Sequence, residues 1–544
     1  MLRIMKRALW LVCAALPLTS LHCKSSQQEQ EPSTATFEPS APTMPRLTTA
    51  QYRNAIADVL GEGLPQTALE PDTNPYLFYS IGAATTLLSE QGTQQYAESA
   101  AQISDAIFAD AKRRDALIGC TPKAVSDDCV RGFVQKLGRQ LFRRPLAQAE
   151  VDRWLSVVSD TAEGDIYRGL RLFVYGLLQS PRFLYRMDLG EADPEKPSSR
   201  RRYDSYEMAS RLSFLLWNTV PDEELLSAAA RGELLDSQSL ETQARRMLGS
   251  PRAREAVQSF FDQYFELSAL SHVERDPKLY PAYSKSLLGA MRTEVQLLVD
   301  DFVFRRETDI RGIFSTRRTF VNQELAKLYQ VDAPEASEVA FVPVSLPPSG
   351  ERAGVLSFGA ILTMNAHPTD TSPTRRGKYL RERVLCLVVP PAPPNVPALT
   401  DNTGSMPKTL RERLEEHRKN PACYSCHSLM DPPGFLFEHF DAIGQFRTTN
   451  NGAPLQTDGV VEGESMSDSR DLAARLAFDP RVGSCLVKQV FRHASARLDA
   501  PGDEAVLSAL TDRFAESGYQ FRELLVELVK SEGFRTAASS EVMP

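Results

Sequence analysis

Residues 423–427 are Cys-Tyr-Ser-Cys-His, and this stretch decides how the C-terminal third of the chain is built. On a helix, Cys423 and Cys426 occupy positions i and i+3 and point to one side of a single turn, with His427 beside them at i+4. This is the shortest sequence that holds a haem through two thioethers and ligates its iron with an imidazole. The pentad therefore predicts one covalent haem c, with His427 as the iron ligand.

The sequence leaves the sixth iron ligand open. Met430 follows His427 by only three residues, so it lies on the same side of the porphyrin and does not reach across the iron. A methionine from another element would raise the reduction potential, whereas an empty position would permit peroxide or oxygen chemistry. The candidates from other elements are Met364, Met406, Met466, His367, His417, His439 and His493.

A basic stretch upstream of the pentad offers partners for the two haem propionates, which must be paired or solvated when buried. Arginine suits this role because its guanidinium binds a carboxylate with two parallel hydrogen bonds. The alternative is a solvated helix face that pairs with acids such as Glu382. The basic residues are Arg375, Arg376, Lys378 and Arg381, with Arg447 further along.

Two other interpretations of the pentad stay open. Cys423, Cys426 and His439 have the spacing of the first three ligands of a zinc finger, with Asp441, His427 or His417 in place of the missing fourth. Zinc is therefore the alternative metal. A disulfide between Cys423 and Cys426 is the other alternative, although it leaves His427 without a role.

The other downstream cysteines are candidates for disulfides in an oxidising compartment. Cys120 and Cys129 flank a short loop and form the natural local pair, which leaves Cys386 and Cys485 as a long-range pair. Two buried free thiols are the alternative for this second pair.

The N-terminus predicts export. Three basic residues precede the apolar run 8–18, which is too short to span a bilayer, so residues 1–23 are expected to be a signal peptide. Cys23 is a candidate lipoprotein cysteine that would tether the protein to a membrane; plain signal cleavage is the alternative. We therefore expect a periplasmic protein, or a lipoprotein of the outer membrane or cell surface. Residues 24–45 are rich in Ser, Gln, Glu, Pro and Thr and predict a flexible linker.

Net charge argues against nucleic acid as a partner. The formal charge of −8 falls to −11 once the leader, which has three basic residues and no acidic ones, is removed. A surface with this excess of acid repels phosphate backbones.

Hydrophobic periodicity predicts a mainly α, multidomain helical protein with a small c-type-haem-like C-terminal region. Phe133, Leu137 and Leu141, for example, recur at helical spacing, and residues 339–344 are the best short strand. Residues 431–434 (Asp-Pro-Pro-Gly) are expected to end the pentad helix. Three acids on one helix, Glu294, Asp300 and Asp301, are interpreted as a solvated face rather than a catalytic pair.

The length of 544 residues requires several domains. After the signal peptide and linker we expect an N-terminal helical domain and then second, third, haem-c-like and C-terminal helical domains. Their predicted boundaries are 46–125, 126–195, 200–332, 349–450 and 466–540.

Read in order, the segments of the chain resemble an exported bacterial, cytochrome-like family that is built from five consecutive domains of unknown function. The resemblance implies export, a mostly helical fold and a Cys-x-x-Cys-His motif in the fourth domain, but no particular reaction. The segments that carry it are residues 47–52, 58–61, 140–146, 180–185, 211–217, 371–377 and 417–427, then 431–434 with Glu438, Phe440, Asp441, Gly444 and Arg447.

These observations predict electron transfer or haem-based oxidoreduction outside the inner membrane. One haem moves one electron at a time, so a redox partner protein is implied, and the family resemblance suggests another exported protein encoded nearby. The chain lacks a Gly-rich phosphate loop, a Gly-x-Ser-x-Gly elbow and a His-Glu-x-x-His motif, so no other catalytic class is indicated. The competing hypothesis is a non-catalytic envelope scaffold or binding protein in which Cys423, Cys426 and His427 form a zinc or disulfide staple.

Overall fold

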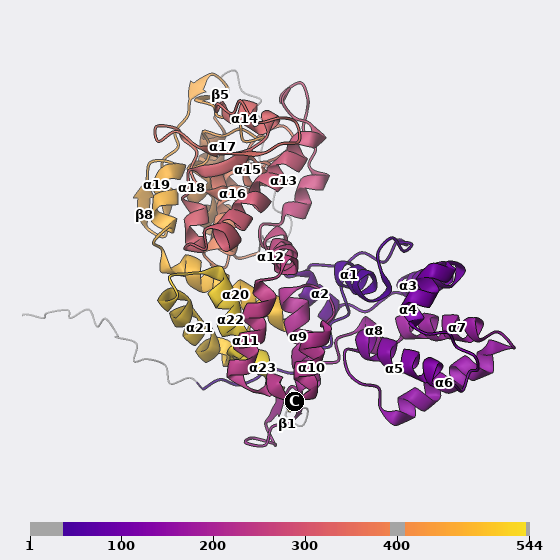
Figure 1. Ribbon diagram of the computed structural model, residues 1–544. Helices are drawn as coiled ribbons and strands as arrows, with labels where there is room; N and C mark the ends of the chain where they lie inside the picture. Colours follow the sequence, from indigo (N-terminus) through magenta and orange to yellow (C-terminus); the bar gives the residue numbers. More distant parts are fainter. Residues whose placement is uncertain (1–35, 392–408, 540–544) are drawn as a thin grey trace, which may run out of the picture. The chain divides into compact units, whose positions relative to one another are not determined.

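The fold is mainly helical, as predicted. The structure is a computed structural model that describes residues 36–391 and 409–539, and within these ranges helices dominate while the strands are short (Figure 1). The predicted signal peptide, Cys23 and Met406 lie outside the described residues.

The N-terminal helices other than α2 surround one buried cluster, whereas Ile81 of α2 packs with the central helices. The helical spacing of Phe133, Leu137 and Leu141 puts all three on the buried side of α5. A capping box starts α1, because the Thr48 hydroxyl accepts from the N–H of Gln51 while the Gln51 side chain accepts from the N–H of Thr48. The helices are α1 (Thr49–Leu60), α2 (Tyr79–Thr85), α3 (Glu90–Ala109), α4 (Ala111–Ile118), α5 (Asp128–Phe142), α6 (Gln148–Ala162), α7 (Ile166–Gln179) and α8 (Pro181–Leu184).

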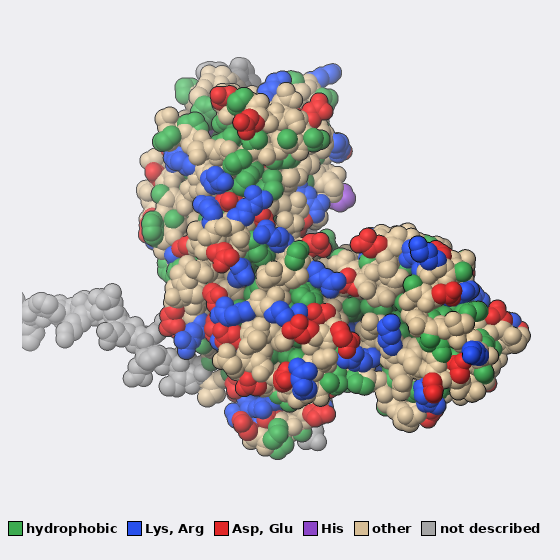
Figure 2. Space-filling model, in the orientation of Figure 1, with side chains coloured by type: hydrophobic (Ala, Val, Ile, Leu, Met, Phe, Trp, Pro, Cys, Tyr) green, Lys and Arg blue, Asp and Glu red, His purple; other side chains and the backbone are tan. Residues whose placement is uncertain are grey.

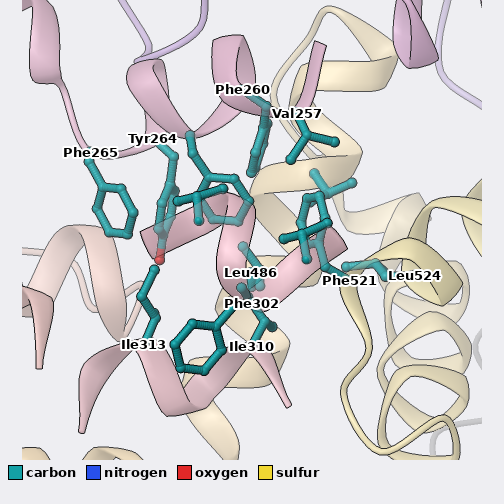
Figure 3. Close-up of a cluster of buried hydrophobic side chains, with 14 of the residues drawn as sticks. Val257, Phe260, Tyr264, Phe265, Phe302, Ile310, Ile313, Leu486, Phe521 and Leu524 are labelled. Carbon is teal, nitrogen blue, oxygen red and sulfur yellow. The ribbon is translucent and has the colours of Figure 1, made fainter. Parts of the chain in front are cut away.

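The central helices contribute aromatic side chains to a second buried cluster. Phe260 and Tyr264 of α12 stack with ring centroids 6.0 Å apart, and Phe260 also lies 5.6 Å from Phe521 near the C-terminus (Figure 3). The central elements are α9 (Ser205–Leu216), α10 (Glu223–Ala230), η1 (Glu233–Leu235), α11 (Ser237–Leu248), α12 (Pro251–Tyr264), η2 (Leu267–His272), α13 (Lys285–Asp300), η3 (Asp301–Arg305), η4 (Ile310–Phe314) and α14 (Gln323–Tyr329).

The C-terminal elements complete this second cluster. Leu486 of α20 and Leu524 of α22 pack among the residues of α12, η3 and η4 (Figure 3). The predicted third, fourth and fifth segments thus share one core. The elements are η5 (Val355–Ser357), α15 (Gly359–Met364), α16 (Pro373–Tyr379), η6 (Leu380–Val384), α17 (Leu410–His417), α18 (Pro421–Phe435), α19 (Ser469–Leu476), α20 (Pro480–Ser495), η7 (Pro501–Asp503), α21 (Glu504–Glu516), α22 (Phe521–Lys530) and α23 (Glu532–Arg535).

The strands form small antiparallel sheets. The order of the largest is β1-β2-β9, with Arg200 opposite Ala538, while β3 pairs with β4, β5 with β6 and β7 with β8. The strand predicted at 339–344 is found, but it begins three residues later. The strands are β1 (Glu191–Ala192), β2 (Arg200–Arg202), β3 (Arg318–Val321), β4 (Val342–Ser345), β5 (Thr449–Asn450), β6 (Ala453–Pro454), β7 (Gly459–Val461), β8 (Glu464–Met466) and β9 (Thr536–Ala538).

The second half of the segment predicted as a flexible linker is bound to the C-terminal region instead. Glu38 donates its N–H to the carbonyl of Gly502, the carbonyl of Ser40 accepts from Ala538, and the Thr43 hydroxyl donates to Ser495. Composition could not reveal these partners, because they lie more than 450 residues away in sequence.

The three acids of the α13 region do not form a solvated face, so that prediction is wrong. Glu294, Asp300 and Asp301 are 0%, 6% and 2% exposed. Distant segments provide most of their partners, which helical spacing alone does not show. Thr319 and Tyr329 donate to Glu294, Arg254 and Arg305 pair with Asp300, and Arg306 and Arg318 pair with Asp301.

Helix α18, which carries the pentad, continues through the prolines that were expected to end it. Pro432 and Pro433 lie inside the helix, and its last residue is Phe435. Helix α16 crosses here with the two backbones in contact: a Cβ on Gly377 would lie 1.8 Å from the Met430 carbonyl oxygen. A Cβ on Gly434 would lie equally close to the carbonyl oxygen of Pro373. This packing holds the proline-containing turn in place despite the hydrogen bonds that proline removes.

Candidate functional site

The pentad occupies the first turns of α18. The Asn420 side chain accepts from the N–H of Ala422, and Pro421 is the first helical residue, so the helix begins just before the motif. Cys423 and Cys426 are 7% and 8% exposed, and their sulfurs are not bonded to each other. The helix therefore presents two buried free thiols one turn apart.

His427 is oriented by a buried carboxylate. Its Nδ1 lies 3.0 and 3.1 Å from the two carboxylate oxygens of Asp431, one helical turn later. Asp431 is fully buried; it also accepts a 2.7 Å hydrogen bond from the Thr374 hydroxyl and lies 4.0 Å from the Arg418 guanidinium. A carboxylate at Nδ1 accepts a hydrogen bond from the proton on that nitrogen, so Nε2 is the nitrogen left with a lone pair for a metal.

A second imidazole lies beside the first. His417, the last residue of α17, has its ring centroid 4.8 Å from that of His427, with the two planes at 75°. Burial lowers the pKa of His417, and the adjacent His427 lowers it further. His417 is therefore held in its neutral form, in which one ring nitrogen is a lone-pair donor.

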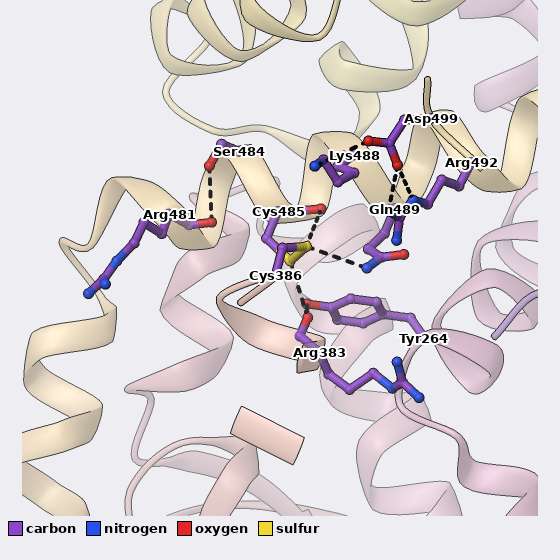
Figure 4. Close-up of a disulfide and its surroundings, with 10 residues drawn as sticks. All are labelled: Tyr264, Arg383, Cys386, Arg481, Ser484, Cys485, Lys488, Gln489, Arg492 and Asp499. Carbon is purple, nitrogen blue, oxygen red and sulfur yellow. Dashed lines mark hydrogen bonds and ion pairs between the residues drawn. A yellow bond between two sulfur atoms is a disulfide. The ribbon is translucent and has the colours of Figure 1, made fainter. Parts of the chain in front are cut away.

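Residues 389 and 390, which follow η6, lie against Cys426 on one side of the cysteine pair. Val389 packs with Cys426 and Met430, and the carbonyl oxygen of Pro390 lies 3.7 Å from the Cys426 sulfur. This segment begins just after Cys386, which is bonded to Cys485 of α20 (Figure 4). The disulfide therefore anchors the chain that lies over the site.

The surroundings of that disulfide are polar and well ordered by hydrogen bonds. The Gln489 amide donates to the Cys386 sulfur at 3.4 Å, and the Tyr264 hydroxyl donates to the carbonyl of Arg383 (Figure 4). The structure also contains a Cys120–Cys129 disulfide, with a separation of nine residues. All four cysteines that the sequence suggested as disulfide partners are thus paired, whereas Cys423 and Cys426 are free.

Arg375 and Arg376 have different environments. Arg376 is buried, and its two Nη groups donate to the carbonyls of Phe437, Phe440 and Asp441 and to Glu438. Burial lowers the pKa of Arg376 to about 10. Arg375 is exposed, with one 3.3 Å contact from its Nη1 to the carbonyl of Ala366. Arg376 therefore fastens the turn after α18, while most of the Arg375 guanidinium is available.

Three further basic residues from the sequence analysis have carboxylate partners within the chain. Lys378 lies 3.8 Å from Glu382, Arg381 pairs with Glu462, and Arg447 donates to Glu438 at 2.8 Å. The basic stretch is thus mostly neutralised by carboxylates of the chain.

Among the sixth-ligand candidates within the described residues, His417 has a ring contact with the pentad and the others contact different parts of the fold. Met364 and Met466 pack against the large core, and His367 donates its backbone N–H to Asp370. His439 lies beside Glu351 and Phe446, and His493 beside Phe78 and Phe260. In residues 36–391 and 409–539, no three His, Cys, Asp or Glu side chains are grouped as metal ligands, so the zinc alternative has no preformed site there.

Sequence reasoning missed the residues that hold His427. Asp431 was interpreted as a helix-ending residue, although its i+4 spacing from His427 is the signal that would have identified the contact. Thr374 and Val389 come from other segments, and nothing in their local sequence marks them.

The comparisons with known proteins identify the family. Five consecutive family models match, each described as a protein of unknown function: DUF1587 at residues 46–109, DUF1595 at 129–188, DUF1592 at 203–331, DUF1588 at 352–450 and DUF1585 at 462–534. The chain belongs to this five-domain family. The pentad lies within the fourth domain. No curated protein and no solved structure matches the chain.

The charged surface and the helices have two further features. On the face drawn in Figure 2, basic and acidic side chains are interspersed rather than gathered by sign. Within the part of the chain that the structure describes, no helix is both long and apolar enough to cross a membrane.

Proposed function

We propose that this protein is an exported haem c protein that acts in electron transfer or haem-based oxidoreduction. The observation that carries the proposal is the pair of free, buried thiols at Cys423 and Cys426, next to a histidine whose Nδ1 is bound by Asp431. These residues fit the group: two thiols on one face of a helix for two thioethers, and an Nε2 lone pair for the iron.

The chain's own residues prepare attachment. Cys423 and Cys426 would hold the haem through two thioethers, each formed by addition of an S–H across a vinyl group, which would consume no oxidant or reductant. This reaction requires reduced sulfurs, which Cys423 and Cys426 have. When bound, the haem supplies one-electron chemistry.

The residues behind His427 support it as the ligand. Asp431 fixes the orientation of the imidazole ring, as carboxylates do for metal-bound histidines in general. Thr374 fixes Asp431 in turn. His417, neutral and adjacent, is our candidate for a group that influences the surroundings of His427 on the same side of the iron.

Arg375 is the better candidate for a propionate partner. Its guanidinium is exposed near the start of α16, whereas the Nη groups of Arg376 are occupied by backbone carbonyls and Glu438. In this proposal Arg376 holds the α16–α18 contact that positions the pentad.

The proposal includes export, through the signal peptide or a lipidated Cys23, and a redox partner protein in the same compartment. Both rest on the sequence of residues 1–23 and on the one-electron capacity of a single haem.

Coexpression with a haem c maturation system tests the proposal. The purified protein is denatured and its pyridine haemochrome spectrum is recorded. In the wild type we expect a covalently retained haem whose haemochrome band is that of two thioether links. In Cys426→Ser the band should shift to that of one link. The absorption spectrum of native His427→Ala protein should lack the normal ligand-field bands.

Ser425→Ala is the matched control, because Ser425 is exposed between the two cysteines and has no assigned role. It should retain the wild-type spectrum. A colourless wild-type protein that carries stoichiometric zinc would instead select the scaffold hypothesis.

A further inference from the structure

A pocket of about 260 Å³ lies at the boundary between the third and fourth domains, away from the pentad. Its walls include Tyr329 from the end of α14, Arg352 before η5, and Phe440 and Phe446 after α18. We call it the Arg352 pocket. A cavity of about 150 Å³ is enough to bind benzene, so this pocket has room for an aromatic ring with a small polar group.

Arg352 brings a buried positive charge to the pocket. The residue is 7% exposed, and its two Nη groups donate to the carbonyls of Ser357 and Gly444. Its guanidinium lies over the rings of Tyr329 at 3.9 Å and Phe440 at 4.5 Å. Among the described residues, no carboxylate forms an ion pair with it, although buried charges are normally paired.

Glu294 and Asp441 act on the charge of Arg352 without forming an ion pair with it, and Glu294 does not supply a full counter-charge. Glu294 accepts from the Tyr329 hydroxyl at 2.7 Å and from Thr319 at 2.6 Å, so the tyrosine stands between it and Arg352. Burial raises the pKa of Glu294 to about 7, so much of it is protonated at neutral pH. The Tyr329 hydroxyl also accepts from the N–H of Gly359. The hydrogen bonds of the Tyr329 hydroxyl are therefore made within the protein. The pocket thus presents the positive charge of Arg352 without a paired carboxylate.

A carboxylate at the rim of the pocket has a cation of its own. Glu351 lies 3.4 Å from the Arg470 guanidinium and 3.5 Å from the Nδ1 of His439. The His439 ring in turn lies 5.6 Å from that of Phe446. Arg470 therefore offsets part of the negative charge of Glu351, and the repulsion of an incoming anion is reduced.

We infer that the Arg352 pocket binds a small aromatic carboxylate, with the ring between Tyr329, Phe440 and Phe446 and the carboxylate toward Arg352. Apolar and aromatic walls with one placed charge are the usual composition of a small-molecule site. Aromatic rings stack favourably on such walls, and arginine is the residue best suited to a planar carboxylate. The inference does not depend on haem binding.

Isothermal titration of the full-length protein with benzoate tests it. We expect saturable binding, with benzamide, which has nearly the same shape but no charge, at least tenfold weaker. Absence of saturable benzoate binding, or equal affinity for benzamide, would overturn the inference.

Variants locate the site. Ser349 is an exposed lining residue, so Ser349→Trp fills the pocket without disturbing the core and should weaken benzoate binding at least tenfold. Phe446→Ala should weaken it severalfold, whereas Phe478→Ala, at a phenylalanine that is 78% exposed and is not among the pocket's lining residues, should leave it unchanged. Unaltered binding in Ser349→Trp would place the ligand elsewhere and refute the assignment.

Discussion

Two cysteine pairs contribute to the fourth domain, and they differ in position and bonding. Cys386 of this domain and Cys485 of the fifth are 99 residues apart and form a disulfide that ties the fourth domain to α20. Cys423 and Cys426 lie one turn apart on α18, are 7% and 8% exposed and remain reduced. Burial therefore does not separate the two pairs, because the free thiols are as protected as a structural cysteine; their position on one helix beside a histidine does.

The regions around the two pairs also have different functions in the fold. The disulfide links segments that are distant in sequence, so it stabilises the fold of the chain as a whole. The pentad depends on a local crossing of α16 and α18 that requires glycines at 377 and 434. Substitutions in each region separately test this difference.

Removing the long-range disulfide should have the largest effect on stability. Without the cross-link the unfolded chain is less restricted, so we expect the unfolding free energy of Cys386→Ser/Cys485→Ser to decrease by about 5 kcal/mol. The Cys120–Cys129 disulfide closes a loop of nine residues, and we expect Cys120→Ser/Cys129→Ser to lose about 3 kcal/mol. Denaturant unfolding of the two double variants measures the difference. Equal losses would contradict the dependence on loop length, and a complete loss of bound haem in the first variant would mean that the two regions are not separable.

The pentad region also differs from the third domain in its buried carboxyl group, because Asp431 faces His427 and Arg418 whereas Glu294 of α13 faces only hydroxyl donors at hydrogen-bond distance. Burial raises the pKa of Glu294 from 4.5 to about 7, so the folded protein binds its proton more tightly than the unfolded chain does. The contribution of Glu294 to stability is therefore greatest below pH 4.5 and is lost as the pH rises to about 7, by roughly 3 kcal/mol in total.

Glu294→Gln removes this titration. We expect the unfolding free energy of the wild type relative to the Glu294→Gln protein to fall across that pH interval and to level off above it, as measured by urea unfolding at several pH values. Parallel curves for the two proteins would show that Glu294 does not titrate in this range.

Widening the helix crossing should have a smaller effect on stability. Gly434→Ala places a methyl group against the carbonyl of Pro373, and overpacking of this kind costs about 2 kcal/mol. Gly289→Ala is the matched control, because a Cβ at this exposed position of α13 meets nothing within 4 Å. It should be neutral or slightly stabilising. Thermal unfolding measures the stability of the two variants. Equal stabilities would mean that α16 and α18 are packed less closely than in the structure.

Local sequence features predicted much of the fold. The Thr48 capping box, the spacing of Phe133, Leu137 and Leu141, and the Ser-Pro start of α16 depend on residues within one or two turns, so a pattern can identify them. The five-domain family was also identified from the sequence, and the family models confirm it.

Features that depend on distant partners were not predicted. Glu294 is buried because Thr319 and Tyr329 meet it from β3 and α14, and residues 36–45 are bound because the C-terminal segment runs beside them. Likewise α18 continues past Pro432 because α16 packs closely against it, which no property of the helix sequence indicates. At the candidate site, the three residues of the pentad were identifiable from spacing, whereas Thr374 and Val389 were not.

The most direct test of the haem assignment is tandem mass spectrometry of the mature protein from its native host, after proteolysis without reductant. The account predicts that the peptide containing residues 423–427 carries one iron porphyrin bound through both cysteines, and that Cys386 and Cys485 are recovered as a linked pair. Recovery of the 423–427 peptide with unmodified thiols, or with its two cysteines joined to each other, would contradict it.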